Sequence, residues 1–251
     1  MERPLILISN DDGYQAPGLR HLVECVADMG DIVVVAPAEP QSAKSSAITA
    51  GLPMRIRQHA NIGPAKVYSV NGTPVDCVKL ALHALFPDRK PDLVLSGMNH
   101  GSNAAINAIY SGTMGAAFEG CICGFPAVAF SLTSHDQGRD LSPTTALIRQ
   151  ITRYVLDHGL PQDVCLNVNF PDTDTIKGAK VVRAARGHWD AEYREYTDPF
   201  GHPFFMLTGA LKNAEPESTD TDEYWLSQGY ASVVPMRPDQ TAAEALKHIN
   251  L

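Results

Sequence analysis

The chain has 251 residues, of which 44% are hydrophobic and 19% are charged, and its formal net charge at pH 7 is -8. This composition is typical of a globular protein with a substantial core, and the negative charge argues against binding of nucleic-acid polymers, which favours basic surfaces. No run of apolar residues approaches the length of a membrane span and the N-terminus does not resemble a signal segment, so we expect a cytoplasmic protein with no membrane partner.

The first two-thirds of the sequence alternate predicted strands and predicted helices. The predicted strands are 4–9, 31–37, 67–70, 92–97, 126–132 and 164–170, and the predicted helices are 17–29, 74–86, 114–123 and about 143–158. Pro17 and Pro74 stand at first helical positions, and Thr73 is a good N-cap. Alternating strands and helices predict an α/β fold, a Rossmann-like, doubly wound and mostly parallel sheet with right-handed crossovers.

The pattern changes near Lys180. The segment 181–207 reads as two strands joined by the turn DPFG, and it carries many aromatic residues. We interpret it as a β-hairpin arm that buries aromatic side chains against another subunit, the alternative being a hairpin folded onto its own domain. A short helix and the strand 230–236 follow. We therefore expect a catalytic core over 1–179 and a C-terminal extension over 180–251, which carries the arm for oligomerisation and returns a strand and a helix to the core.

The five cysteines show no pairing typical of zinc ligands or of a disulfide framework. We expect all of them to be small buried apolar residues, as free cysteines commonly are.

Two adjacent carboxylates, Asp11 and Asp12, follow the first predicted strand directly. At a buried strand end such a pair costs free energy unless a cation or a set of hydrogen bonds compensates. The simpler interpretation is a turn, since Asn, Asp and Gly are common turn residues.

Polar residues also follow the other predicted strands. In chain order they are Asn10, Asp11 and Asp12; Ser42, Ser45 and Ser46; and Asn99, His100, Ser102 and Asn103. The carboxyl ends of parallel strands meet at one edge of an open sheet, where ligands bind. Carboxylate, hydroxyl and amide oxygens suit Mg²⁺, Mn²⁺ or Ca²⁺. The sequence YSGTMG opens a helix and offers backbone N–H groups and hydroxyls to an anion. A cation beside such a helix end indicates phosphate chemistry.

Several common motifs are absent from the sequence. GxGxxG, GxxxxGK[ST] and GxSxG do not occur, and the later ligands of an EF-hand loop are missing. A dinucleotide fingerprint, a P-loop and a nucleophile elbow are thereby excluded.

The blocks SNDDG, VVAP, NGTPVDCV, LVLSGMNHGSN, YSGT and GYASVVPM, in this order from Ile6 to Met236, resemble the SurE family of stationary-phase survival proteins, which are metal-dependent 5'/3'-nucleotidases. The resemblance implies a Rossmann-like region and a C-terminal part that extends into a homodimer or homotetramer. It implies that one divalent metal is held by Asp11, Asp12, Ser42 and Asn99. It also implies hydrolysis of nucleoside monophosphates, and in some members of short polyphosphate. Departures at 101–103, at 218–220 and around 188 bear on substrate preference.

On this interpretation Mg²⁺ or Mn²⁺ binds a phosphoryl oxygen and lowers the pKa of a bound water. Asp11, Asp12 and Asn99 are the expected catalytic residues, and an oxygen of Asp11 or Asp12 is the candidate general base. The expected phosphate-binding residues are Asn10, Asn103, Ser111, Gly112 and Thr113, of which Asn10 and Asn103 would orient either the metal shell or the phosphate. His100 is expected to have a positional role.

Two other functions remain open at this stage. One is a Rossmann-like glycosyltransferase that uses Mn²⁺ and a nucleotide-sugar, and the other is a nucleotide-binding or assembly protein without turnover. For a nucleobase, Tyr14 and Tyr110 are candidate stacking residues, although Tyr14 would also fit a surface turn and Tyr110 a core position.

Overall fold

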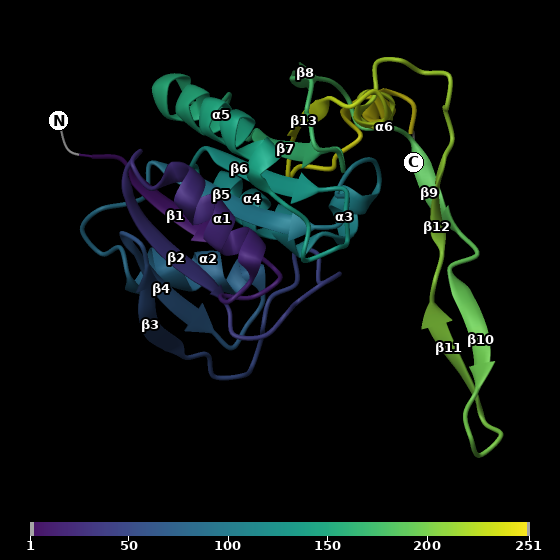
Figure 1. Cartoon of the computed structure of the whole chain (residues 1–251), viewed down its shortest axis with the longest axis horizontal. Helices are drawn as coiled ribbons and strands as arrows, with labels where there is room; N and C mark the ends of the chain where they lie inside the picture. The colour runs from purple at the N-terminus through teal and green to yellow at the C-terminus, as the bar shows by residue number, and fades with distance from the viewer. Residues whose placement is uncertain (1–2, 250–251) are drawn as a thin grey trace.

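A nine-stranded sheet forms the centre of the molecule, with its strands in the order β3-β4-β2-β1-β5-β6-β7-β13-β8 (Figure 1). The computed structural model describes residues 3–249. The strands of this sheet are β1 (Leu5–Ser9), β2 (Asp31–Pro37), β3 (Ile56–Ile62), β4 (Ala65–Val70), β5 (Leu93–His100), β6 (Ala127–Leu132), β7 (Cys165–Phe170), β8 (Ala179–Val181) and β13 (Ala231–Met236). Neighbours from β4 to β7 are parallel, while β3 and β13 run antiparallel to β4 and β7. The predicted α/β, mostly parallel architecture is confirmed.

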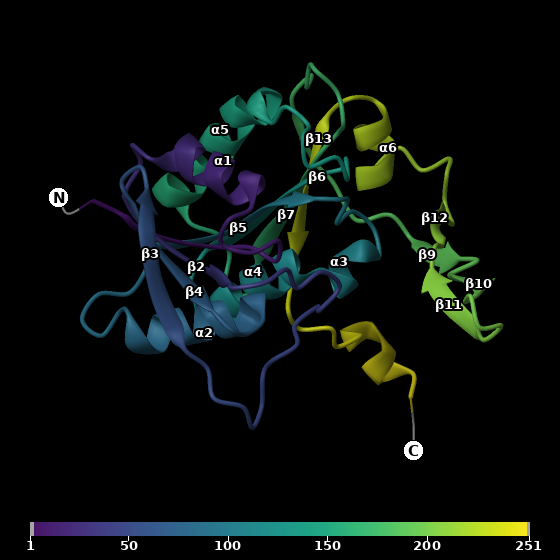
Figure 2. The same ribbon diagram turned by 60° about the horizontal axis from the view of Figure 1, so that its bottom comes forward.

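Helices cover both faces of the sheet (Figure 2). The longer ones are α1 (Pro17–Val26), α2 (Pro74–Ala84), α4 (Gly112–Ile122) and α5 (Thr145–His158). The short ones are α3 (Asn107–Tyr110), α6 (Asp222–Ser227), η1 (Ser142–Thr144) and η2 (Ala243–Lys247). No helix in residues 3–249 is long and apolar enough to cross a bilayer.

The two faces of the sheet bury two separate apolar clusters. On β1, Ile6 and Ile8 belong to the cluster that contains the buried residues of α1 and α5, while Leu5 and Leu7 belong to the cluster under α2 and α4. This alternation follows from the period of two in a strand, because both faces of a parallel sheet are covered. The apolar runs that predicted these strands are nearly continuous because side chains on both faces of each strand are buried.

Local signals position helix α2 as expected. The Thr73 side chain accepts a hydrogen bond from the Asp76 backbone, and the Asp76 carboxylate accepts one from the Thr73 backbone, so the helix begins with a capping box. The Asp76 carboxylate also accepts bonds from the backbone and hydroxyl of Thr49. The helix start therefore anchors the long loop after β2.

One strand was not predicted, and two local predictions were wrong. Strand β3 was not expected, because its sequence IRQHANI is mostly polar, as befits an exposed edge strand. Strand β5 continues to His100 instead of ending at Gly97. Of the cysteines, Cys123 is exposed, because it lies at the C-terminal end of α4 instead of inside it.

The C-terminal segment leaves the sheet as a long two-stranded arm and then returns (Figure 1). Its strands are β9 (Gly187–Asp190), β10 (Tyr193–Thr197), β11 (Pro203–Leu207) and β12 (Ala210–Asn213). β9 pairs with β12 near the base and β10 pairs with β11 near the tip, both antiparallel. At the tip, Asp198 accepts hydrogen bonds from the backbones of Phe200 and His202. After the arm, α6 and β13 rejoin the main body, where β13 pairs with β7.

Candidate active site

The loop after β1 is fixed by Asn10. Its side-chain oxygen accepts a hydrogen bond from the Gly13 backbone at 3.2 Å, and its amide nitrogen donates to the Gly13 carbonyl at 2.9 Å. Gly13 has φ +97°, a conformation that favours glycine. Because both ends of the Asn10 amide are used in this turn, the structure favours its orienting role over direct phosphate contact.

Asp11 is buried at this turn, and helix α4 fixes the position of its side chain. The Thr113 hydroxyl donates a hydrogen bond to Oδ1 of Asp11. Burial raises the pKa of Asp11 to about 6, with the Thr113 bond opposing the rise and the Asp12 carboxylate adding to it. Gly112 permits the close approach, since a Cβ at that position would lie 2.9 Å from the Cβ of Asp11. A nearby cation would offset the cost of ionising this carboxyl.

Asp12 and His100 leave polar atoms without hydrogen bonds. The Oδ2 atom of Asp12 and both ring nitrogens of His100 are buried, and they have no hydrogen-bond partner within residues 3–249. Nδ1 of His100 lies 3.9 Å from Oδ2 of Asp12, which is too long for a hydrogen bond. Buried polar groups are normally paired. An orphaned carboxylate oxygen beside the buried Asp11 therefore fits a bound cation.

The irregular end of β5 brings Asn99 to the same place. The pairing of β5 with β6 shifts register between Ser96 and Asn99, and such irregularities redirect side chains. The amide nitrogen of Asn99 donates to the Gly101 carbonyl at 2.8 Å. That bond orients the amide and leaves its oxygen available as a ligand. Strands β1 and β5 are neighbours at the switch in strand order, and Asn99 and Asp11 line the same cavity.

Ser42 is exposed on the loop after β2, and hydrogen bonds hold this loop at both ends. The backbone of Gln41 donates to the Asp11 carbonyl at 2.7 Å. The backbone and the hydroxyl of Ser45 donate to the Tyr110 and Ile109 carbonyls, at 3.0 and 2.5 Å. These bonds keep the Ser42 loop between the Asp11 turn and helix α3.

A cavity of about 450 Å³ joins these segments. Five predicted site residues line it: Asp11, Ser42, Asn99, Asn103 and Ser111. Four other predicted residues do not line the cavity. Asn10 and Asp12 flank Asp11 in its turn, and Gly112 and Thr113 pack against or hydrogen-bond to Asp11.

The hydroxyls of Ser111 and Thr113 differ in what they can still donate. Oγ of Ser111 accepts a hydrogen bond from the Met114 backbone at 3.1 Å and caps α4, so its own proton is free for a ligand. The Thr113 proton is already donated to Asp11. The structure thus favours Ser111 as the anion-binding hydroxyl and Thr113 as the residue that orients Asp11.

A buried amide network holds Asn103. Its backbone donates to Oδ1 of Asn169 and its side chain donates to Oγ of Ser131, both at 2.8 Å, while Asn167 donates to its carbonyl at 2.8 Å. Sequence reasoning missed Asn167 and Asn169. Their signal was available as two asparagines at alternate positions of the buried strand CLNVNF.

Residues of the arm form the other wall of the cavity, which the sequence did not indicate. Trp189, Tyr193 and Leu207 contribute to the lining, together with Tyr110. Nε1 of Trp189 donates to Oδ1 of Asn107 at 2.9 Å and ties the arm to α3. Of the two candidate stacking residues, Tyr110 lines this cavity, whereas Tyr14 stacks on His59 elsewhere.

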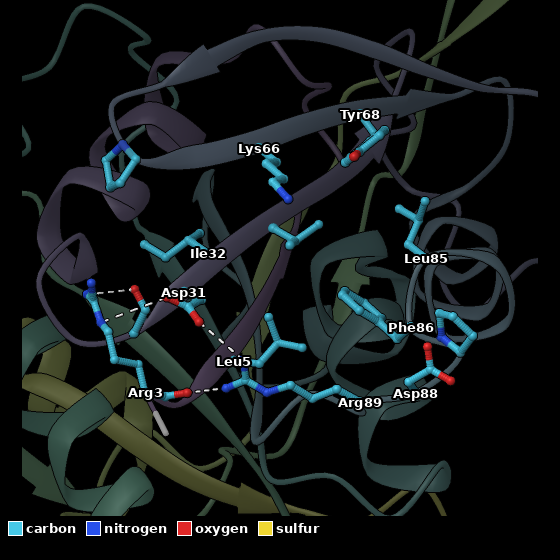
Figure 3. A pocket seen from close by; sticks show the side chains of 14 residues that line it. Arg3, Leu5, Asp31, Ile32, Lys66, Tyr68, Leu85, Phe86, Asp88 and Arg89 are labelled. Atoms are coloured by element: carbon cyan, nitrogen blue, oxygen red, sulfur yellow. Dashed lines mark hydrogen bonds and ion pairs between the residues drawn. The ribbon is translucent and has the colours of Figure 1, made fainter. Parts of the chain in front are cut away.

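A second cavity, of about 530 Å³, opens at the opposite edge of the sheet (Figure 3). Two of its cationic residues, Arg3 and Arg89, pair with Asp31, at 3.9 and 3.2 Å. None of the predicted site residues lines it. Five of them line the 450 Å³ cavity, which is therefore the better candidate for catalysis.

Within residues 3–249 no group of three or more His, Cys, Asp or Glu side chains is gathered for a metal ion. A metal at the candidate site would have two carboxylates, with serine and asparagine oxygens completing the set. That donor set suits a hard cation such as Mg²⁺ or Mn²⁺ and is unlike a zinc site.

Comparison with known proteins gives the family of the chain. A family profile described as "Survival protein SurE" matches residues 6–191. The chain belongs to the SurE family. It is 46% identical over 253 residues to the "5'-nucleotidase SurE" of Phocaeicola vulgatus, covering 100% of this chain and 98% of that protein. It is 47% identical to the protein of the same name from Christiangramia forsetii, with 99% and 96% covered. The crystal structure of the SurE protein from Aquifex aeolicus superposes with a TM-score of 0.85 at 36% identity, covering 98% of each chain.

Proposed function

We propose that this chain is a metal-dependent phosphomonoesterase that hydrolyses nucleoside 5'-monophosphates, and 3'-monophosphates as well, to nucleoside and phosphate. The observation that carries the proposal is the acidic pair Asp11 and Asp12. Asp11 is buried, Oδ2 of Asp12 is a buried oxygen without a hydrogen-bond partner within residues 3–249, and Asp11 lines one cavity with Asn99 and with Ser111 at the capped start of α4. Relatives that match almost the whole chain are named 5'-nucleotidase.

In this proposal Asp11, Asp12, Ser42 and Asn99 hold one divalent cation, Mg²⁺ or Mn²⁺. Such a cation, when bound, polarises a phosphoryl oxygen and lowers the pKa of a water molecule. Thr113 keeps Asp11 in one orientation through its hydrogen bond. An oxygen of Asp11 or Asp12 accepts the proton of the attacking water.

The phosphate is held at the start of α4. The Ser111 hydroxyl and the first backbone N–H groups of the helix donate to its oxygens, because these groups lack partners inside the helix. Asn103, fixed by Ser131 and Asn169, contributes the second hydrogen of its amide nitrogen. These donors favour the charge that develops on the phosphoryl group during in-line displacement.

The nucleoside lies against the aromatic part of the cavity in this proposal. Tyr110 and Trp189 supply ring surfaces for a base, and Asn107 fixes the indole of Trp189. Stacking on such surfaces tolerates different bases.

We further propose that residues 180–251 form an extension that assembles the chain into a homodimer or homotetramer. On the arm, the exposed fractions of Tyr193, Phe200 and Phe205 are 67%, 85% and 62%. An apolar surface of this kind marks an interaction site. Light scattering of the Phe200→Ser/Phe205→Ser variant should give a smaller mass than the unaltered chain, and an unchanged oligomeric mass would contradict this assignment.

Phosphate release from a panel of 5'- and 3'-nucleoside monophosphates and tripolyphosphate tests the activity, with EDTA and with added Mg²⁺ or Mn²⁺. We expect release that requires the metal. Transfer from a nucleotide-sugar without release from monophosphates would favour the glycosyltransferase alternative. Tight binding without release from any substrate would favour a binding protein.

A further inference from the structure

A third cavity, of about 280 Å³, is lined by residues around the edge strand β3 and of the loops after β1 and β2. Strand β3 lies at one end of the strand order in the sheet (Figure 1). The lining of the cavity consists of Tyr14, Ala38, Glu39, Arg55, Arg57, His59, Ser69 and Asn71. None of these residues lines the 450 Å³ cavity. It is therefore separate from the candidate active site, although both share the loops after β1 and β2.

The basic side chains of this cavity share one face of the edge. Arg55, Arg57 and His59 occupy alternate positions, and the intervening Ile56 packs against the apolar cluster on the other side of the sheet. Since successive side chains of a strand point to opposite faces, all three basic residues are presented to the cavity. Arg55 is also held by its backbone N–H, which donates to Oδ1 of Asn71 at 2.6 Å.

His59 is immobilised in the cavity wall. Its ring stacks on Tyr14 with centroids 4.1 Å apart, and its Nε2 lies 2.8 Å from Oγ of Ser69. Ser69 is buried and pairs with Arg57 in the register of β3 and β4. A ring held on two sides offers a preorganised wall to a ligand.

Basic residues outnumber acidic ones in the lining of this cavity. Within residues 3–249 the guanidinium groups of Arg55 and Arg57 make no hydrogen bond and no ion pair, and Glu39 is the only acidic residue in the lining. In the cavity of Figure 3, by contrast, Asp31 pairs with both arginines. Although the chain has a net charge of -8, a cavity with two unpaired guanidinium groups attracts anions locally.

We propose that Arg55, Arg57 and His59 form a second anion site, which binds a phosphate group carried either by inorganic phosphate or by a nucleotide. Guanidinium groups match phosphate oxygens in paired, charge-assisted hydrogen bonds. The Tyr14 and His59 rings stack on each other, so the site recognises the phosphate and leaves no slot between them for a base.

Calorimetric titration of the full chain in EDTA, with inorganic phosphate and separately with AMP, tests the site without turnover. We expect Arg55→Gln/Arg57→Gln to weaken binding of at least one ligand about tenfold, or about 1.4 kcal/mol. The matched control is Arg20→Gln/Arg194→Gln, which removes the same charge from exposed positions and should stay within about twofold of the unaltered chain. Binding of both ligands identifies the phosphate group alone, and binding of AMP only identifies a nucleotide.

Equal weakening in both double variants would reduce the effect to overall charge and would overturn the proposal. So would unchanged affinity in Arg55→Gln/Arg57→Gln, particularly with increased self-association, because charges on an edge strand also prevent edge-to-edge pairing. The Asp12→Asn variant should keep the binding lost in Arg55→Gln/Arg57→Gln. The second site is thereby tested independently of the proposed hydrolysis.

Discussion

The candidate active-site cavity has two walls of different construction. The core wall consists of Asp11, Asn99 and Asn103, whose side chains are buried. Asp11 accepts a hydrogen bond from Thr113 of α4, Asn99 donates to the Gly101 carbonyl, and Asn103 donates to Ser131 of β6. The arm wall consists of exposed or half-buried residues such as Trp189 and Tyr193, and a hydrogen bond from Trp189 to Asn107 ties it to the core. Because its side chains are fixed, we expect the core wall to hold the reacting groups, and we expect the more exposed arm wall to accept the variable part of a substrate. Changes in the core wall should therefore lower kcat, while changes in the arm wall should raise KM.

The largest effect is expected from Asp12→Asn. Because it removes one of two anionic ligands while preserving shape, kcat for a nucleoside monophosphate should fall about a thousandfold. The melting temperature without metal should not fall, since a buried charge without partners is removed. Steady-state kinetics and thermal melts measure both. The control Asp157→Asn, at an exposed position of α5, should retain full activity. A near-normal kcat in Asp12→Asn would contradict the assignment of Asp12 as a metal ligand.

A smaller effect on kcat is expected from Thr113→Val, which removes the hydrogen bond to Asp11 but keeps the volume. Loss of a group that orients a metal ligand commonly costs ten- to a hundredfold, so we expect a decrease of that size in kcat and weaker activation by Mn²⁺ in a metal titration. Thr152→Val is a matched control, because the Thr152 hydroxyl is buried and has no partner within residues 3–249. It should leave kcat unchanged. Equal effects of the two variants would refute the orienting role of Thr113.

The arm wall is tested by Trp189→Ala. Loss of one stacking surface should raise KM about tenfold while kcat changes little. Trp189→Phe keeps a ring but loses the bond to Asn107, so it should give an intermediate KM. If Trp189→Ala lowers kcat as strongly as it raises KM, the two walls do not divide their tasks in this way.

The two walls also differ in how far the sequence predicted them. Residues of the core wall follow directly after apolar strands, and the rule that parallel strands end at one edge brings them together without further information. This rule anticipated the convergence of Asp11, Ser42, Asn99 and Ser111 on one cavity. It did not indicate that Thr113 donates its proton to Asp11, because this depends on the depth at which α4 packs.

The contribution of the arm was missed for a different reason. Trp189 and Asn107 are far apart in the sequence, and no local pattern predicts their contact. The split of the arm into two pairs of strands was missed too, since residues 181–207 read as one hairpin. Strand β3 had no alternation of apolar residues from which it could be predicted, because its sequence is mostly polar and one face carries Arg57 and His59. Sequence patterns predicted elements that are buried on both sides and missed those that are exposed.

The smallest effect concerns the junction of the arm with the body. Arg183 donates hydrogen bonds to Glu215 and Asp220, and these bonds hold the pKa of both carboxyls below their ordinary values. Since the folded-state pKa is depressed, the stabilisation is present above the unfolded-state values near 4 and is lost as the pH falls through the lower folded-state values. Arg183→Gln should therefore lower the melting temperature by about 1–2 °C at pH 7 and by less as the pH approaches about 3. Arg194→Gln, with no ion pair among the described residues, should show no such pH dependence. A difference between Arg183→Gln and the unaltered chain that stays constant from pH 7 to about pH 3 would mean that these carboxyls do not stabilise the base of the arm.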